Sequence, residues 1–193
     1  MPTPCHLNHV EMVHAPGERR LALRFLELLG GRLSVNPTGS PIGLDIGHQL
    51  TVGFPHDNAL YVSEVTPHQW AFESSLRSTV EADRSLAARR ADYLAELRRT
   101  PQTSYHFGIR FDTRERLEAR IEIIREASTT EELAGRMELT GVYPPGTYTN
   151  TMLQAFLFTD VIAAGLLYLG QHIELQWRMD APPLEEAALV ASS

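Results

Sequence analysis

The stretch LYLGQHIELQW, residues 167–177, alternates like a β-strand but carries a carboxylate, Glu174, inside an apolar run. Side chains two residues apart lie on the same face of a strand. The apolar face then carries Ile173, Leu175 and Trp177, and the polar face carries His172, Glu174 and Gln176. The acid at position 174 is therefore the first residue that needs an explanation.

Three earlier segments alternate in a similar way, residues 7–13 less regularly than residues 46–54 and 103–111. His9 and Glu11 share one face in the first of them, and Ser104, His106, Gly108 and Arg110 share one face in the last. A sheet packed on one side by a helix needs one apolar face, and its polar face is often only solvated. If two such sheets curve around each other, these polar side chains converge.

The chain contains a degenerate internal repeat, which is the first feature to look for in any sequence. The repeat places His106 where His9 lies in the first half, and Glu174 where Thr51 lies. The similar pairs are LNHVEMV (7–13) with SYHFGIRF (104–111), LELLGGRLSV (26–35) with EELAGRMELTGV (131–142), and IGHQLTVGF (46–54) with LGQHIELQW (169–177). The repeat predicts the order βαβββ twice within an α+β fold. The expected parts of this single domain are a first module at about 6–60, a helical insertion at about 66–100, a second module at about 103–180 and a tail at 181–193.

The helices are predicted from apolar residues at helical spacing. Residues 16–29 and about 113–127 are the expected module helices, and Gly30-Gly31 is the expected stop of the first. Thr66 followed by Pro67 is typical of a helix start. Nothing after Pro67 breaks the pattern for about 30 residues, so the insertion is predicted as one long helix or two shorter ones. Its expected packing stripe is Trp70, Leu76, Val80, Leu86, Tyr93 and Leu97.

Composition excludes several classes of protein. The 193 residues are 43% hydrophobic, which is enough for a packed core, and the net charge of −7 argues against a nucleic-acid partner. The single cysteine, Cys5, allows no disulfide within the chain. The longest apolar run is too short for a bilayer, and the first residues lack the pattern of a signal peptide. We therefore expect a cytoplasmic protein with no membrane partner.

The order and spacing of four motifs resemble the vicinal oxygen chelate superfamily, which includes glyoxalase I, extradiol dioxygenases and the bleomycin resistance proteins. The motifs are HVEMV (9–13), LELLGG (26–31), YHFGIRF (105–111) and GQHIEL (170–175). The resemblance implies paired βαβββ modules whose curved sheets form a metal cleft. It also implies that His9, His106 and Glu174 are the metal ligands.

A set of two histidines and one carboxylate suits Fe²⁺, with Zn²⁺, Mn²⁺ or Ni²⁺ as other candidates. In this interpretation Glu174 is the third ligand. The residues alone leave a second interpretation open, in which Glu174 is a solvated or hydrogen-bonded acid unrelated to the two histidines. His172, on the same face as Glu174, is a hydrogen-bond donor behind the ligands, a substrate contact or a surface residue.

The resemblance implies an enzyme that uses the metal as a Lewis acid on a small molecule with vicinal oxygens, either a ring-cleaving dioxygenase or a lyase or isomerase. Glu11, on the face of His9, is a candidate base. Arg110 is a candidate anion-binding residue or a structural ion-pair partner, and Tyr168 is the only phenol near the last strand. The alternatives are a metal-free drug-sequestering protein of the bleomycin-resistance type and an interaction module that uses the inserted helix. Small members of the superfamily commonly form homodimers, so we expect a homodimer.

Overall fold

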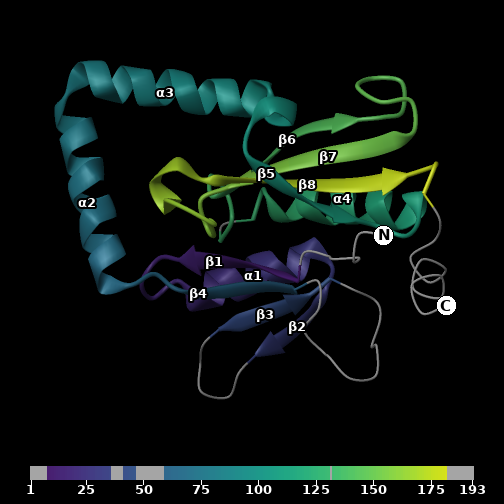
Figure 1. Cartoon of the computed structure of the whole chain (residues 1–193), viewed down its shortest axis with the longest axis horizontal. Helices are drawn as coiled ribbons and strands as arrows, with labels where there is room; N and C mark the ends of the chain where they lie inside the picture. Colours follow the sequence, from purple (N-terminus) through teal and green to yellow (C-terminus); the bar gives the residue numbers. More distant parts are fainter. Residues whose placement is uncertain (1–7, 36–40, 47–58, 131, 182–193) are drawn as a thin grey trace, which may run out of the picture.

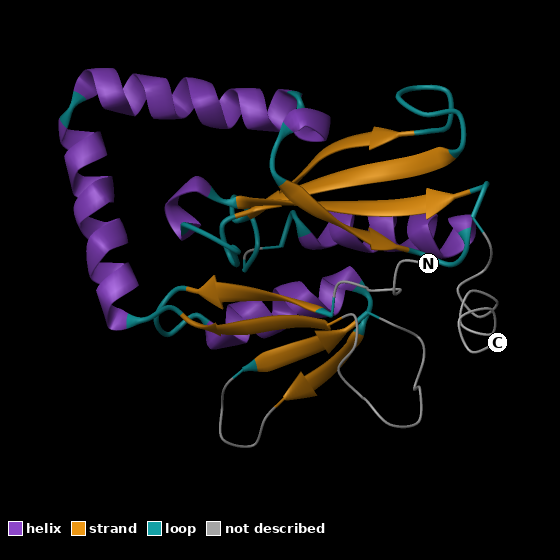
Figure 2. Cartoon of the chain, in the orientation of Figure 1, coloured by secondary structure: helices purple, strands orange, loops and turns teal. Residues whose placement is uncertain are grey.

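The computed structural model describes residues 8–35, 41–46, 59–130 and 132–181. Within these residues the chain is an α+β protein with two four-stranded mixed sheets and four α-helices (Figures 1 and 2). The two sheets come from the two halves of the chain. None of the described helices has the length and hydropathy needed to cross a membrane.

The first sheet has the strand order β1-β4-β3-β2, with β1 parallel to β4. Its helix starts at Arg19 and not at the expected residue 16, because Pro16 and Gly17 form a turn in which Gly17 has a φ of 75°. It ends as expected at Gly30, which has a φ of 91°. The elements are β1 (His9–His14), α1 (Arg19–Leu29), β2 (Arg32–Val35), β3 (Ile42–Asp45) and β4 (Ala59–Glu64).

The second sheet repeats this pattern with the order β5-β8-β7-β6, and β5 is parallel to β8. Its helix begins after Thr113, whose side chain accepts a hydrogen bond from the Arg116 backbone. Both halves therefore have the order β-α-β-β-β and the same strand pairing. The elements are β5 (His106–Arg110), α4 (Arg114–Ala127), β6 (Met137–Tyr143), β7 (Met152–Thr159) and β8 (Gln171–Arg178).

The expected equivalence of Thr51 and Glu174 is wrong. The strand that matches β8 is β4, because β4 is the parallel partner of the first strand in its sheet. His9 and His106 are the first residues of β1 and β5. The residue two positions after His9, Glu11, pairs with Tyr61. The residue two positions after His106, Gly108, pairs with Glu174. Tyr61 therefore holds the position of Glu174 in the first sheet. Thr51 itself lies outside the described residues.

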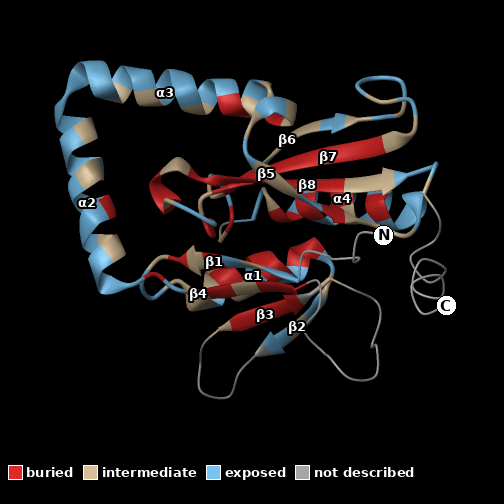
Figure 3. Cartoon of the chain, in the orientation of Figure 1, coloured by how far each residue is buried: buried red, intermediate tan, exposed pale blue. Residues whose placement is uncertain are grey.

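One hydrophobic core joins the two halves (Figure 3). Helices α1 and α4 contact each other, and the apolar faces of both sheets pack with them. Val13 in β1 also exchanges two backbone hydrogen bonds with Ala163, which follows β7. Phe25, Leu26, Leu117, Ile124, Leu157, Ile173 and Leu175 are among the buried core residues. Since the helices cover the apolar faces, the polar faces of both sheets remain for a functional site.

The insertion forms two helices, α2 (Pro67–Ala82) and α3 (Arg84–Arg99), which we call the helical arm. Figure 1 shows the arm leaving β4, running along one side of the molecule and returning above the second sheet to β5. Thr66 caps α2 as predicted, accepting a hydrogen bond from the Gln69 backbone. The break between the helices is at Asp83, whose carboxylate caps α3.

The arm is packed less completely than its predicted stripe implies. Leu97 is the only residue of that stripe that is buried, and Leu86 and Tyr93 are exposed. The buried residue of α2 is an acid, Glu73, whose side chain is 3% exposed. Its carboxylate accepts a hydrogen bond from the backbone of Tyr168, at 3.0 Å. The arm is thus attached to the connection before β8 partly through a polar contact.

Candidate functional site

The structure brings two of the predicted ligands together on the polar face of the second sheet. His106 Nε2 lies 3.4 Å from Glu174 Oε2. Parallel pairing of β5 with β8 places Gly108 opposite Glu174, so the His106 side chain is a diagonal neighbour of the acid. Glu174 is 7% exposed and therefore needs a compensating positive charge or hydrogen bonds.

The hydrogen bonds of His106 define which nitrogen faces Glu174. His106 Nδ1 lies 2.8 Å from the Ser104 carbonyl oxygen, which can only accept, so Nδ1 carries the hydrogen. In the neutral ring Nε2 is then an acceptor that faces another acceptor, the carboxylate. Two facing acceptors need a hydrogen or a cation between them, which a proton on either group, a water molecule or a metal ion can supply.

The separation of these two atoms fits a shared metal ion. Metal–nitrogen and metal–oxygen bonds are each roughly 2.1 Å, so two ligands on one ion lie roughly 3.0 Å apart at right angles and roughly 3.4 Å apart at a tetrahedral angle. The observed 3.4 Å falls in that range. An imidazole and a carboxylate are also ligands that Fe²⁺ and Zn²⁺ accept.

A chain of two glutamines holds the carboxylate in place. Gln154 Nε2 donates to Glu174 Oε1 at 2.6 Å, and Gln102 Nε2 donates to Gln154 Oε1 at 3.1 Å. This contact occupies Oε1 and leaves Oε2 directed at His106. Hydrogen bonds of this kind orient ligands in metal sites.

A glycine keeps the space beside the carboxylate open. A Cβ atom on Gly108 would lie 3.5 Å from Glu174 Oε2 and 3.1 Å from Gln176 Nε2. Any larger side chain at this position would therefore cover the oxygen that faces His106. The backbone of Gly108 is ordinary strand, so the residue is not needed for a turn.

His172 is the pairing partner of His106 on β8 and is 1% exposed. Ser104 Oγ donates to the Pro101 carbonyl oxygen, so it accepts from His172 Nδ1 at 2.9 Å. His172 Nε2 is buried and has no hydrogen-bond partner among the described residues. Burial, followed by the charges of His106 and Arg98, lowers the pKa of His172 to about 4. The ring is therefore neutral at pH 7.

The remaining predicted residues of the first sheet do not join this pair. His9 is exposed, with Nδ1 2.8 Å from Asn8 Oδ1 and its ring against Tyr61. Glu11, also exposed, accepts from Ser63 Oγ at 3.4 Å. Among the described residues no three His, Cys, Asp or Glu side chains form a group that could hold a metal ion. The set of His9, His106 and Glu174 therefore stays a prediction.

Arg110 and Tyr168 lie in different surroundings. Arg110 follows His106 on the same face of β5, opposite Gln176 of β8. Tyr168 is buried in a short 3₁₀ helix, η2 (Leu167–Leu169), with the guanidinium of Arg90 3.8 Å from its ring centre. Arg110 thus remains next to the pair, whereas Tyr168 contacts the helical arm. The catalytic roles expected for both stay predictions.

Sequence reasoning missed Gln102 and Gln154, which support the pair, and placed Ser104 on the polar face with His106 without giving it a role. Gln154 gave a usable signal, because it is a polar residue in the apolar strand segment MLQAFLFT, as Glu174 is in the last strand. Gln102 lies in the link between the arm and β5. Its position gave no comparable signal, since polar residues are common in links.

Comparison of the chain with protein-family models, with curated proteins and with solved structures finds no match. The function must therefore be inferred from the fold, from the His106–Glu174 pair and from the sequence resemblance.

Proposed function

We propose that the chain is a metal-dependent enzyme that acts as a Lewis acid on a small molecule with vicinal oxygens. In this proposal the two halves are paired βαβββ modules whose curved sheets form a cleft. The metal ligands are His106 and Glu174, with His9 as the third, and Fe²⁺ is the favoured ion. The reaction is ring cleavage with O₂ or a lyase or isomerase reaction.

The observation that carries the proposal is the approach of His106 Nε2 to Glu174 Oε2. The Ser104 carbonyl holds the proton on the far nitrogen of the ring, so the near nitrogen is available as a ligand. Gln154 holds the other carboxylate oxygen, and Gly108 leaves room beside the near one. All three features are those expected of a site that binds a cation.

A bound divalent ion would supply charge stabilisation for an enolate, alkoxide or other oxyanion of the substrate. The protein side chains have separate roles. Arg110, on the same face, is proposed to hold an anionic group of the substrate. Glu11, on the polar face of the first sheet, is proposed as the base. Tyr168, which contacts the helical arm, has no role in this proposal.

The second candidate function is metal-free binding of a small molecule, as in drug-sequestering proteins. It is favoured by the fact that His106 and Glu174 can also form an ion pair if His106 is protonated. In that case the polar face would bind a ligand without catalysis. The two functions differ in one measurable property, which is metal content.

The test is metal analysis by mass spectrometry on protein purified without an affinity tag or added metal, and again after anaerobic incubation with Fe²⁺, Zn²⁺, Mn²⁺ or Ni²⁺. We expect about one equivalent in the wild type and less than a tenth of that in Glu174→Gln and in His106→Gln. His68→Gln, in an exposed position on α2, is the matched control and should keep the metal. His9→Gln tests the third ligand.

Circular dichroism should show that all four variants are folded. Metal at wild-type levels in both Glu174→Gln and His106→Gln would rule out this site. If the wild type binds none of the four candidate ions, the sequestering function becomes the better proposal.

A further inference from the structure

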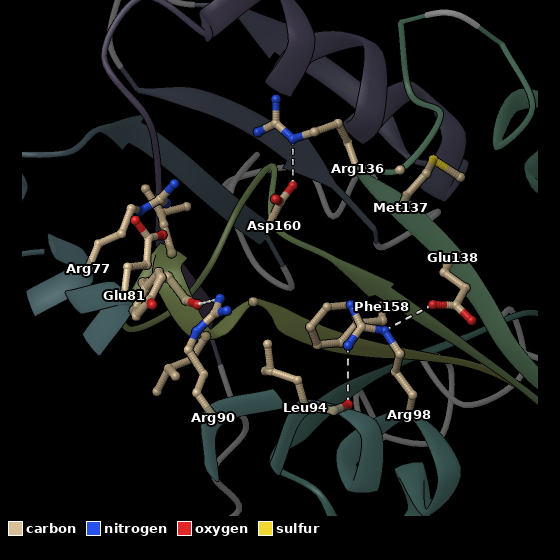
Figure 4. Close-up of a pocket in the computed structure, with 15 residues that line it drawn as sticks. Arg77, Glu81, Arg90, Leu94, Arg98, Arg136, Met137, Glu138, Phe158 and Asp160 are labelled. Atoms are coloured by element: carbon tan, nitrogen blue, oxygen red, sulfur yellow. Dashed lines mark hydrogen bonds and ion pairs between the residues drawn. The ribbon is translucent and has the colours of Figure 1, made fainter. Parts of the chain in front are cut away.

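A cavity lies between the helical arm and the end of the second sheet (Figure 4). Its volume is about 420 Å³, which is within the range of small-molecule pockets. Residues from α2, α3, β6, the end of β7 and η2 line it. His106, Gly108 and Glu174 are not among them, so this is a separate site, which we call the arm cavity.

Four arginines line the arm cavity, and two of them are neutralised. Arg98 Nε donates to Glu138 at 2.9 Å. Arg136 donates to Asp160 at 2.7 Å and, through both terminal nitrogens, to Glu18. These two arginines therefore contribute little free positive charge.

The other two arginines, Arg77 and Arg90, make no ion pair with any described residue. Both lie against the ring of Tyr168, with their guanidinium carbons 5.1 and 3.8 Å from its centre. Arg90 donates to the Tyr168 carbonyl at 2.6 Å, and its buried Nε has no hydrogen-bond partner among the described residues. Glu81 is the acid on this side of the cavity. A buried donor without an acceptor is unfavourable and is relieved when an acceptor binds.

The rest of the lining is mixed, because the acids Glu81, Glu138 and Asp160 lie beside aromatic and aliphatic side chains. It contains the rings of Tyr168 and Phe158 and the side chains of Leu94, Met137, Leu167 and Leu169. Figure 4 shows Arg90, Leu94 and Arg98 along one side of the cavity, as their spacing of four residues on α3 requires. A ligand here would meet apolar walls and guanidinium groups at once.

We infer that the arm cavity binds a small organic acid whose carboxylate contacts Arg90 and Arg77 and whose apolar or aromatic body packs on Tyr168 and Phe158. Guanidinium groups bind carboxylates through paired hydrogen bonds, and aromatic walls favour a flat body. An inorganic anion would pair with the arginines but would make no apolar contact with the aromatic rings. A neutral apolar compound would pack against the aromatic rings and leave the arginines without an ion pair.

The inference is tested by isothermal titration calorimetry on the full chain with three probes: 2-naphthoate, its neutral analogue 2-naphthylmethanol, and inorganic phosphate. We expect 2-naphthoate to bind at one site, with an affinity at least about tenfold above that of either other probe. The affinity should also fall as salt is raised. Equal binding of the alcohol, or tighter binding of phosphate, would overturn the inference.

Two variants locate the site. Arg90→Gln and Arg77→Gln should each weaken 2-naphthoate binding by about tenfold or more. Arg99→Gln is the control, because Arg99 is an exposed residue of the same helix and does not line the cavity. Arg90 also contacts the Tyr168 backbone, so Arg90→Gln can fail to fold. In that case the test is 2-naphthoate binding by Arg77→Gln, because Arg77 is exposed. Wild-type affinity in folded Arg77→Gln would refute the site.

Discussion

Tyr61 in the first sheet and Glu174 in the second occupy the same position relative to the first strand of their sheets. Tyr61 lies on β4, two residues after the residue that pairs with His9. Glu174 lies on β8, two residues after the residue that pairs with His106. The histidine of the first sheet, His9, contacts the Tyr61 ring edge-on, with ring centres 5.5 Å apart. The histidine of the second sheet, His106, faces a carboxylate instead.

This difference makes the two halves chemically unequal although their strand order is the same. The second half holds an imidazole and an acid at ligand distance, together with the glutamines that support the acid. The first half offers an aromatic phenol at the matching position. The proposed metal site therefore depends mainly on the second half, and His9 is the ligand proposed from the first.

Replacement of Gly108 by valine should abolish metal binding without unfolding the protein. The added side chain would lie against Glu174 Oε2 and Gln176, and only a flexible side chain has to move to make room for it. Gly165→Val is the control, because a Cβ at Gly165 has nothing within 4 Å. Metal content and thermal unfolding are measured on both variants. A metal-loaded Gly108→Val protein would show that the ion does not use Oε2.

Replacement of Arg136 by glutamine should lower the free energy of unfolding by about 1–3 kcal/mol. The side chain links Glu18, the cap of α1, to Asp160 after β7, and these carboxylates raise the pKa of Arg136 above its usual range. Without the guanidinium, two acids would lie close together with no cation between them. Urea unfolding is the measurement. Arg114→Gln, which removes an exposed pair with Glu118, should change stability by less than about 0.5 kcal/mol.

Stability should fall as the pH is lowered from about 6.5 to about 4, partly because of His172. The pKa of His172 is about 4 in the folded protein, against about 6.5 in the unfolded chain. Between these values the unfolded chain binds a proton that the folded protein does not, which favours unfolding by about 2–3 kcal/mol over the window.

The pH effect is measured by urea unfolding of metal-stripped protein at several pH values. Carboxylates also titrate in this range, so the test is the difference between the wild type and His172→Asn. The variant should keep a donor to Ser104 and show a smaller loss of stability below pH 6.5. Identical pH profiles would mean that His172 is accessible to protons in the folded protein.

Replacement of Glu73 by alanine should loosen the helical arm. The carboxylate accepts hydrogen bonds from Gln69 and from the backbone of Tyr168, and its loss would leave that buried amide without its acceptor. We expect a loss of about 1–3 kcal/mol and faster hydrogen exchange at the Tyr168 amide. Glu96→Ala, an exposed substitution on α3, is the control. Unchanged exchange at Tyr168 would mean that the arm is attached by its apolar contacts alone.

Much of the fold could be predicted from local patterns. Alternation identified the strands that contain His106 and Glu174, and the Thr66-Pro67 pair marked the start of α2 correctly. The break at Asp83 was not predicted, because Asp is compatible with both a helix interior and a cap. The register of the first half was also missed. The last strand of the first half, β4, begins at Ala59, later in the chain than the repeat indicated. The length of the connection before a strand cannot be read from sequence similarity alone.

The candidate site, like the fold, was predictable only in part from the sequence. The sequence by itself determined which faces are polar, because side chains in a strand alternate whatever the surroundings. It thereby placed His106, Arg110 and Glu174 on polar faces. Only the tertiary structure decided that His106 and Glu174 approach to 3.4 Å, that Gln154 supports the acid and that two arginines of the arm lie against the Tyr168 ring. These relationships depend on strand pairing and helix packing between residues far apart in the chain, which no local pattern specifies.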